Sequence, residues 1–139
     1  MRQASQTLTL ASRGRGLTEF TAAIHRFLAD TGIRDGLLTV FCRHTSASLV
    51  IQENADPDVR ADLEAFFARL APDGDPRYRH DTEGPDDMPA HIRAALTQTS
   101  LAIPVSGGRP ALGTWQGVYL WEHRTRGHQR EVVLQVIGE

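Results

Sequence analysis

The chain contains no lysine: all 15 basic residues among its 139 residues are arginines. Schiff-base catalysis, a pyridoxal-phosphate anchor and a P-loop phosphate site each depend on a lysine amine, so all three are excluded. An anionic ligand must therefore be held by arginine, by backbone N–H groups, by hydroxyls or by a metal ion.

Cysteine is nearly absent as well, and Cys42 is its single occurrence. An internal disulfide and a multi-cysteine zinc cluster both need more than one thiol, so both are excluded. Cys42 follows an apolar run, "LLTVF". We therefore expect it to be a small buried hydrophobic residue rather than a nucleophile.

Strong net charge and long apolar runs are also missing. The formal net charge is −2 and no block of basic residues occurs, so the usual electrostatic footprint of a nucleic-acid-binding protein is lacking. No apolar run approaches the roughly 20 residues of a membrane span, and the N-terminal segment lacks the core of a signal peptide. We expect a cytoplasmic protein with no nucleic-acid or membrane partner, folded as one domain over residues 1–139.

Two segments have helical periodicity. In residues 17–32 we expect a helix that is capped by Thr18 and stopped by Gly32. Residues 55–70 give the clearest helix, because Asp56 can cap it and a proline fits its first turn. The core-facing stripe of this second helix is expected at Val59, Leu63, Phe66, Phe67 and Leu70.

Apolar or alternating segments predict six strands, at residues 5–11, 36–43, 47–52, 100–106, 116–124 and 130–138. The second of these is nearly all apolar, which indicates a buried strand. The last two are separated by a short loop that contains glycine, and we expect them to pair as an antiparallel hairpin. Helices and strands interleave irregularly, which favours an α+β fold around a mixed β-sheet.

The long acidic segment ahead of His91 has no helical or strand pattern, and unstructured connections of this length are often functional. Asp86 or Asp87 can cap a short helix that would place His91 in its first turn or just beyond. The positive end of that helix disfavours imidazolium, so we expect a neutral ring able to bind a metal ion or polarise a carbonyl. His80 and Asp81 would add a second ligand and a carboxylate. A solvated acidic loop fits the composition equally well.

A second candidate site is the segment "RHTSASL" at residues 43–49. His44 follows an apolar strand, and the hydroxyls of Thr45, Ser46 and Ser48 come within the next four residues. Imidazole and hydroxyls at a strand end suit a metal or phosphoryl site. No Gly-x-Ser-x-Gly elbow frames either serine, so a serine hydrolase is not expected. The spacing of the histidines matches no local zinc motif, so a shared site would have to be assembled by the fold.

Four further residues are weaker candidates. Arg109 lies in a glycine-rich stretch, where it could clamp an anion or simply flank a tight connection between strands. Gln116 could bind a ligand or cap a turn. Glu122 ends an apolar strand face, where it could act as a general base or a ligand, although strand ends are more often solvated. Glu53 could point into the same cleft.

The segments "HTSASLVIQENADPDVRADLE", "HDTEGPDDMPAHI" and "GTWQGVYLWEH" closely resemble the signature blocks of the YjbQ-like family. Members of that family are often labelled secondary thiamine-phosphate synthase. The three blocks occur in the family's order, and the similarity runs over essentially the whole chain.

The resemblance implies a mixed β-sheet curved into a half-barrel, with helices packed on one side, and a homotrimer. It also implies a polar site. His44, His80 and His91 would line that site as metal ligands. His91 and the carboxylates of Asp81, Glu53 and Glu122 would act in catalysis. Ser46, Ser48, Arg109 and Gln116 would hold a phosphate of the substrate. Cys42 and His123 occupy positions that vary in the family, so both are expected to lie outside the site.

The family label implies a transferase that joins a pyrimidine pyrophosphate to a thiazole phosphate and releases pyrophosphate. That chemistry needs a divalent metal, usually Mg²⁺, to neutralise the leaving group. Two alternatives stay open. A Zn²⁺ ion on the three histidines would make the protein a hydrolase, and a trimeric module that only binds a phosphorylated metabolite would use the same residues without turnover.

Overall fold

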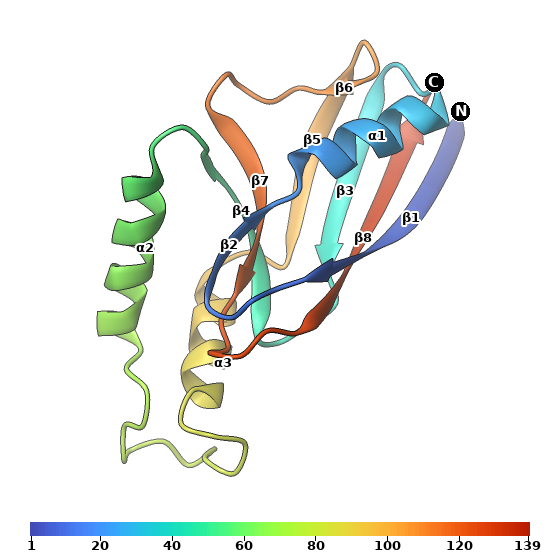
Figure 1. Cartoon of the computed structure of the whole chain (residues 1–139). Helices are drawn as coiled ribbons and strands as arrows, with labels where there is room; N and C mark the ends of the chain where they lie inside the picture. Colours follow the sequence, from blue (N-terminus) through green and yellow to red (C-terminus); the bar gives the residue numbers. More distant parts are fainter.

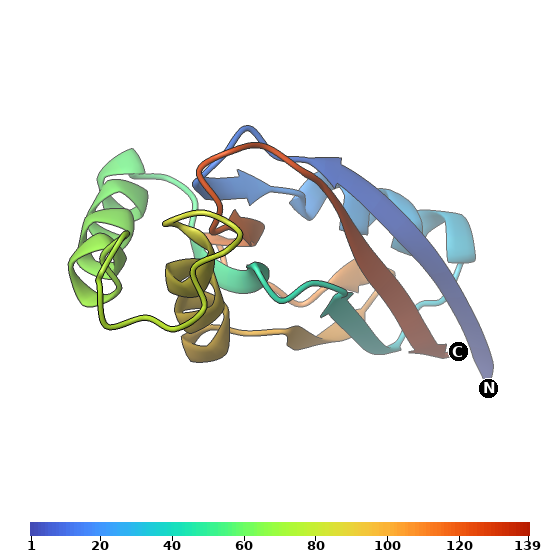
Figure 2. The same ribbon diagram turned by 90° about the horizontal axis from the view of Figure 1, so that it is seen from below.

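Alternating apolar side chains build two antiparallel sheets in the computed structural model, which describes residues 1–139. The first sheet has the order β1 (Arg2–Ala11), β8 (Gln129–Gly138), β3 (Gly36–Cys42), β5 (Ser100–Ser106) and β6 (Arg109–Pro110). The second has the order β2 (Gly16–Glu19), β7 (Gln116–Glu122) and β4 (Ala47–Glu53). The sheets curl around one core, and the two chain ends lie side by side because β1 pairs with β8 (Figures 1 and 2).

The predicted α+β class and half-barrel are confirmed, with curled antiparallel sheets accompanied by three helices. Every pair of neighbouring strands is antiparallel, whereas a mixed sheet was expected. The strands of the second sheet reach the edge of the fold where α3 begins, and this edge carries the polar residues described below.

Helix α1 (Thr21–Thr31) packs across the sheet and supplies Ile24, Phe27 and Leu28 to the buried core (Figure 1). It ends at Gly32, as predicted, in the left-handed conformation that glycine adopts without strain (φ 71°). The predicted start at Thr18 is wrong. Residues 16–19 form β2 instead, because their backbone pairs with β7, and the helix begins three residues after Thr18.

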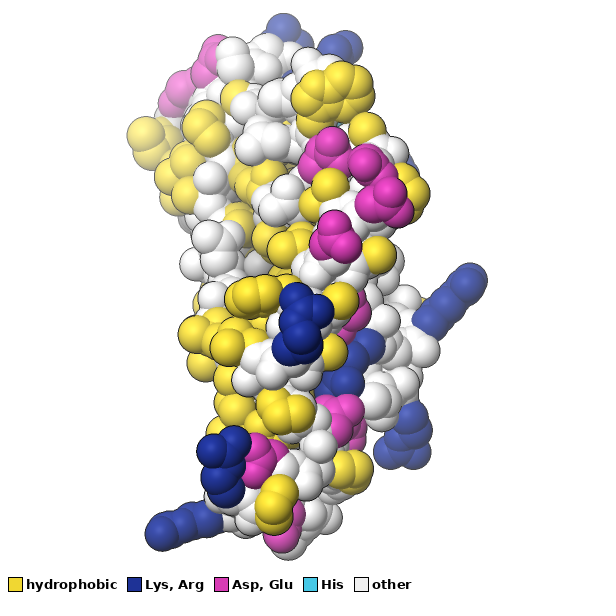
Figure 3. All heavy atoms as spheres, turned by 90° about the vertical axis from the view of Figure 1, so that its left-hand side faces the viewer, with side chains coloured by type: hydrophobic (Ala, Val, Ile, Leu, Met, Phe, Trp, Pro, Cys, Tyr) yellow, Lys and Arg dark blue, Asp and Glu magenta, His cyan; other side chains and the backbone are white.

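Helix α2 (Pro57–Leu70) begins as predicted, with the Asp56 side chain accepting a hydrogen bond from the backbone N–H of Asp58 at 2.9 Å. The prediction that its apolar stripe faces the core is wrong, since no residue of this helix is buried. Phe66 and Leu70 are each 51% exposed. The reason is that α2 packs on the face of β7 that points away from the core, where Phe67 contacts Trp121 with ring centroids 5.0 Å apart. The other side of α2 faces outward, and hydrophobic side chains gather along that face (Figure 3).

The predicted hairpin between the last two long strands does not form. β7 pairs with β2 and β4, whereas β8 pairs with β1 and β3, so the chain changes sheet between residues 122 and 129. Strand β3 is also not fully buried, because Leu37 and Phe41 lie on its outer face. Its inner residues, including Cys42, are buried as expected.

Helix α3 (Asp87–Leu96) follows a connection without helices or strands, as predicted. Asp86 stands at its N-cap position, but its side chain makes no capping hydrogen bond and instead reaches the segment after β7. None of the three helices has the length and apolar character needed to cross a membrane.

Candidate metal centre

The first turns of α3 bring two potential ligands together. Asp87 and His91 are four residues apart on this helix, so their side chains project from the same face. His80, from the preceding loop, completes the cluster. Asp87 Oδ2 lies 2.6 Å from His80 Nε2 and 3.1 Å from His91 Nε2. The three ligand atoms all lie within 4.8 Å of one another.

Arg124, which follows β7, fixes the carboxylate of this cluster. Its Nη1 donates to Asp87 Oδ1 at 2.8 Å, and its Nε donates to Asp86 Oδ2 at 3.0 Å. A third hydrogen bond runs to the carbonyl of Glu83 at 2.8 Å. Because Arg124 occupies Oδ1, the other oxygen of Asp87 is left facing the two imidazoles, which is the usual arrangement of an oriented metal ligand.

The hydrogen bonds of His91 test whether a cation fits here. Its Nδ1 lies 3.0 Å from the carbonyl oxygen of Thr45, which can only accept, so Nδ1 carries the proton. A neutral imidazole has a single N–H, and Nε2 then presents a lone pair to the carboxylate oxygen of Asp87. Two lone pairs face each other unless a proton or a metal ion lies between them. The donor set therefore fits a cation.

Neighbouring groups keep the carboxylate of Asp87 ionised, but the same carboxylate favours a proton on His80, which competes with a metal ion. Burial tends to raise the pKa of Asp87, but a hydrogen bond from His80 and the charge of Arg124 outweigh it, so this pKa lies below its usual range. The hydrogen bond to Asp87 raises the pKa of His80. The carboxylate is thus ionised at neutral pH, as a metal ligand must be.

Two hollows flank the cluster. One of about 300 Å³ is lined by His44, Thr45, His91, Ala94, Ala95 and Thr99. The other, of about 270 Å³, is lined mainly by loop residues and includes His80 and Asp81. A small molecule held in the first hollow would reach His91 and thereby the metal centre.

His44 lies beside His91 in the first hollow but is not part of the convergent cluster. Its Nε2 accepts a hydrogen bond from the backbone N–H of Glu131 at 2.8 Å, which turns the ring toward β8. Burial, followed by the charge of Arg130, lowers the pKa of His44. Of the three histidines expected to bind metal, the structure therefore brings two together and places Asp87 beside them as a third potential ligand.

Glu122 forms a separate buried ion pair with Arg130, and Ser46 accepts a hydrogen bond from the same arginine. Arg130 donates to both carboxylate oxygens of Glu122, at 2.8 and 2.5 Å, and to Ser46 Oγ at 3.0 Å. Burial tends to raise the pKa of Glu122, but hydrogen bonds from Arg130 and Ser12 lower it overall. Both predicted residues are thus occupied in joining β7, β8 and the β3–β4 connection.

Ser48 lies deeper in the fold. Its Oγ is 2.8 Å from Nε2 of His123, whose other ring nitrogen is buried without a partner. Burial, followed by the charge of Arg93, lowers the pKa of His123 to about 3. Ser48 and His123 therefore act as interior residues and do not face either hollow.

The remaining predicted residues are scattered. Asp81 lines the loop hollow next to His80. Glu53 accepts a hydrogen bond from the N–H of Asp56 just before α2, and Gln116 accepts one from the N–H of Gly113 in a turn. Arg109 lies on β6, at the other end of the molecule from α3 (Figure 1).

Two residues of the centre were not predicted from the sequence: Asp87, a potential ligand, and Arg124, which donates a hydrogen bond to it. The Asp-x-x-x-His spacing of residues 87–91 was visible in the sequence, and on a helix it places both side chains on one face. Asp87 was predicted only as a helix cap, so its spacing from His91 was not used to predict a ligand. Arg124 carried no local signal, since its partners lie 37 and 38 residues away.

Related proteins share this sequence over nearly its full length. The chain is 59% identical over 138 residues to UPF0047 protein sll1880 of Synechocystis, covering 99% of this chain and 94% of that protein. It is 47% identical over 135 residues to UPF0047 protein YjbQ of Escherichia coli O157:H7, covering 96% of this chain and 97% of that one. These likenesses involve the whole domain rather than one motif.

Solved structures give the same result. The conserved hypothetical protein TT1486 from Thermus thermophilus aligns with a TM-score of 0.86 at 33% identity, covering 95% of this chain and 99% of that one. A YjbQ/UPF0047 family protein from Clostridium acetobutylicum aligns with a TM-score of 0.83 at 35% identity, covering 96% and 99%. Residues 6–139 match the family model described as UPF0047 protein YjbQ-like. The chain therefore belongs to the YjbQ-like UPF0047 family.

Proposed function

We propose that this protein is a metal-dependent enzyme that acts on phosphorylated small molecules, with His80, Asp87 and His91 as its metal ligands. The convergence of the three ligand atoms within 4.8 Å of one another carries the proposal. Two further observations support it, namely the hydrogen bond of Arg124 to Asp87 and that of His91 Nδ1 to Thr45, which leaves Nε2 of His91 facing Asp87 Oδ2.

The donor set favours one kind of ion over another. Two imidazoles and one carboxylate suit Zn²⁺, Mn²⁺ or Fe²⁺, whereas Mg²⁺ prefers oxygen ligands. When bound, such an ion would supply Lewis acidity toward a phosphoryl oxygen or lower the pKa of a water molecule. This geometry therefore supports a resident transition metal better than it supports Mg²⁺ that arrives with the substrate.

The protein's own groups would position both ion and substrate. Arg124 holds the Asp87 carboxylate in a fixed orientation, and the Thr45 carbonyl holds the His91 ring. The small side chains of Ala94 and Ala95 leave space beside His91 for a substrate. His44, kept neutral near pH 7 by its lowered pKa, lies on the wall of the same hollow.

Metal content tests the ligand assignment directly. Untagged protein that is purified, stripped and reloaded with Zn²⁺ should hold one ion per chain by elemental analysis. Asp87→Asn and His80→Gln should each lose that ion, because each removes one of only three protein ligands. Asp30→Asn, an exposed aspartate on α1, is the matched control and should retain it. Equal zinc content in all four proteins would contradict the proposal.

The substrate pair is a finer part of the proposal. The family label points to a pyrimidine pyrophosphate and a thiazole phosphate, joined with release of pyrophosphate. Pyrophosphate release should occur with the metal-loaded protein and fall to background in Asp87→Asn. Saturable binding of both precursors without turnover would instead identify a binding module.

A second candidate function is a zinc-dependent hydrolase of phosphorylated small molecules, which the two imidazole ligands favour. Three protein ligands leave positions open on Zn²⁺, the arrangement that activates water. Release of inorganic phosphate from a panel of phosphate monoesters separates this candidate from the transferase. Phosphate release in the absence of any second substrate would favour hydrolysis.

A homotrimer remains part of the proposal. The exposed apolar side chains of α2, Phe66 and Leu70, supply a surface that self-association would bury. Sedimentation should therefore give three times the chain mass of 15.3 kDa, and Phe66→Glu should reduce it. A monomer at micromolar concentration would remove the trimer from the proposal without affecting the metal ligands.

A further inference from the structure

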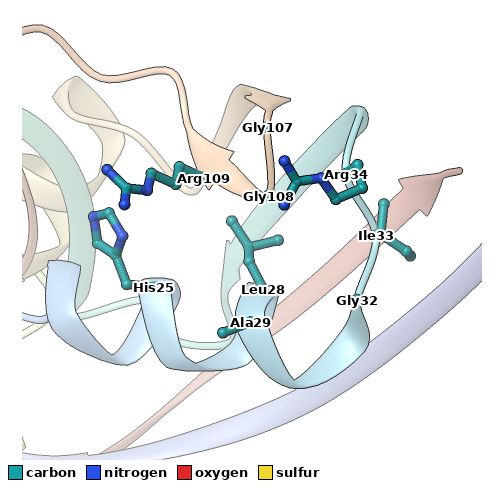
Figure 4. A pocket seen from close by; sticks show the side chains of 9 residues that line it. All are labelled: His25, Leu28, Ala29, Gly32, Ile33, Arg34, Gly107, Gly108 and Arg109. Carbon is teal, nitrogen blue, oxygen red and sulfur yellow. The ribbon is translucent and has the colours of Figure 1, made fainter.

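A cavity of about 660 Å³ lies at the end of the molecule remote from the metal centre. It is larger than either hollow beside His91. Its walls are the second half of α1, the connection from α1 to β3, and the turn between β5 and β6 (Figure 4). None of these elements contributes to the metal centre, so the cavity has no part in the function proposed above.

Three basic side chains face this cavity. His25 projects from α1 toward Arg109 of β6, and Arg34 lies farther along the same opening (Figure 4). None of the three side chains forms an ion pair or a hydrogen bond within the protein. The carboxylate adjacent to this turn, that of Asp35, is directed to the N–H of Gly107 at 3.4 Å.

The turn between β5 and β6 is shaped to admit a guanidinium. Gly107 and Gly108 both have positive φ, 59° and 79°, as a two-residue hairpin turn of this kind requires. A Cβ atom on Gly108 would lie 3.4 Å from Nη1 of Arg34. Because Gly107 and Gly108 have no side chains, the opening stays clear and Arg34 can lie beside it.

Like charges gathered without counter-charges repel one another, and an anion placed between them relieves that repulsion. The carbonyl end of α1 also reaches this region and would oppose an anion, but Arg2 donates to the carbonyl of Thr31 at 2.5 Å and offsets part of that charge. The terminal carboxyl group of Glu139 accepts hydrogen bonds from the backbone N–H groups of Arg34 and Asp35 at 2.7 and 3.2 Å, but Glu139 does not line the cavity. The charged side chains that line it are those of Arg34 and Arg109, and guanidinium groups bind phosphate and carboxylate with two parallel hydrogen bonds.

We propose that this cavity is a second ligand site, which binds a small polyanion through Arg34 and Arg109 with His25 as a further donor. Its volume accommodates a small metabolite rather than a polymer. Phosphate and carboxylate groups offer the same hydrogen-bond acceptors to these side chains, so the ligand class is a metabolite that carries at least two such groups. The site is independent of the metal centre.

Binding to metal-free protein tests the proposal, with inorganic pyrophosphate and citrate as probes and glycerol as the neutral control. Calorimetry should show saturable binding of at least one probe and none of glycerol. In ¹H–¹⁵N spectra the amide signals of Gly107 and Gly108 should move with the same saturation curve. A preference for pyrophosphate over citrate would identify a phosphorylated ligand, and the reverse would identify a polycarboxylate.

Substitutions in the cavity test whether the probes bind there. Arg34→Gln and Arg109→Gln should each weaken it by about tenfold or more, because each removes a charged hydrogen-bond donor. Ala29→Glu, which places a carboxylate in the cavity, should abolish it. Arg26→Gln is the matched control, an exposed arginine of α1 outside the cavity, and should bind as the wild type does.

Asp87→Asn separates this site from the metal centre, since it should bind the probes normally while losing the metal. The proposal is overturned if neither probe binds, or if the loss in Arg34→Gln and Arg109→Gln is no greater than in Arg26→Gln. It is also overturned if only Asp87→Asn loses binding. All the substituted positions in and around the cavity are exposed, so each variant should retain the melting temperature of the wild type to within a few degrees.

Discussion

The two ends of the molecule use arginine in opposite ways. At the end where α3 begins, Arg124 and Arg130 are paired with carboxylates that are nearly buried. At the end formed by β6 and the last turns of α1, Arg34 and Arg109 have no such partner. The first end is held together by its charges, whereas the second has charge available for a ligand. Composition alone does not separate these uses, since the chain has only arginine for both.

The largest effect should come from breaking a pair at the first end. Glu122→Gln leaves the guanidinium of Arg130 buried without its counter-charge, and we expect a loss of about 3 kcal/mol in the free energy of unfolding. Urea denaturation measures this loss in the free energy of unfolding. Glu131→Gln is the control, because its pair with Arg43 is about half exposed and 3.8 Å long, and it should cost less than about 1 kcal/mol. Equal losses would mean that burial does not distinguish these pairs.

The second effect concerns the support of the metal ligands. Arg124→Gln removes the clamp on Asp87 without removing a ligand, so Zn²⁺ affinity should fall by roughly tenfold to a hundredfold rather than vanish. Competition with a chromogenic chelator gives the affinity. Arg34→Gln, at the other end of the molecule, should leave it unchanged. If both variants bind zinc as the wild type does, Arg124 has no role in orienting Asp87.

The third effect is a pH dependence at the paired end. The pKa of His123 is about 3 in the folded protein against 6.5 for the free side chain, because burial and the charge of Arg93 disfavour its protonation. Between these values the unfolded chain takes up a proton that the folded chain does not, so stability falls as the pH is lowered through that window. We expect His123 to contribute about 2 kcal/mol to the loss between pH 7 and pH 5.

His123→Gln should remove that contribution. Its free energy of unfolding, measured at intervals between pH 7 and pH 5, should change less than that of the wild type. The raised pKa of His80 works in the opposite direction in both proteins and cancels in the comparison. Parallel curves for the two proteins would show that His123 is not kept neutral by the fold.

The smallest effect belongs to the unpaired end. Arg34→Gln removes one of two neighbouring guanidinium groups that form no ion pair, so at low salt the free energy of unfolding should rise by about 0.2–0.5 kcal/mol. The gain should disappear in about 0.5 M salt, where such charges are screened. A loss of stability comparable with that in Glu122→Gln would mean that Arg34 is held by a partner, and the contrast between the two ends would fail.

Local rules account for the parts of the fold that the sequence predicted correctly. The cap of α2 at Asp56 and the stop of α1 at Gly32 each depend on neighbours within a few residues. The predicted start at Thr18 failed because a distant strand, β7, captured that segment. The predicted hairpin failed for the same reason, since the partners of β7 and β8 come from elsewhere in the chain.

The candidate site was likewise predicted from the sequence only in part. His80 and His91 could be selected from the sequence because histidines in an acidic loop and in a helix's first turns are suited to metal binding. Arg109 was grouped with them because of its glycine-rich setting and the family resemblance, and the fold places it at the opposite end (Figure 1). Asp87 was visible but was assigned a capping role, which the structure gives to neither it nor Asp86.

The sequence by itself determined the chemical inventory, the start of α2, the stop of α1 and the family, because residue types and short-range capping depend on neighbouring residues only. Only the tertiary structure decided which side chains meet. Arg124 reaches Asp87 across 37 residues, and α2 packs on the outer face of β7 through Phe67 and Trp121, which lie far apart in the sequence, rather than joining the core. Such choices depend on the packing of the whole chain, where several partners compete for each strand and each charge, and no local window contains that competition.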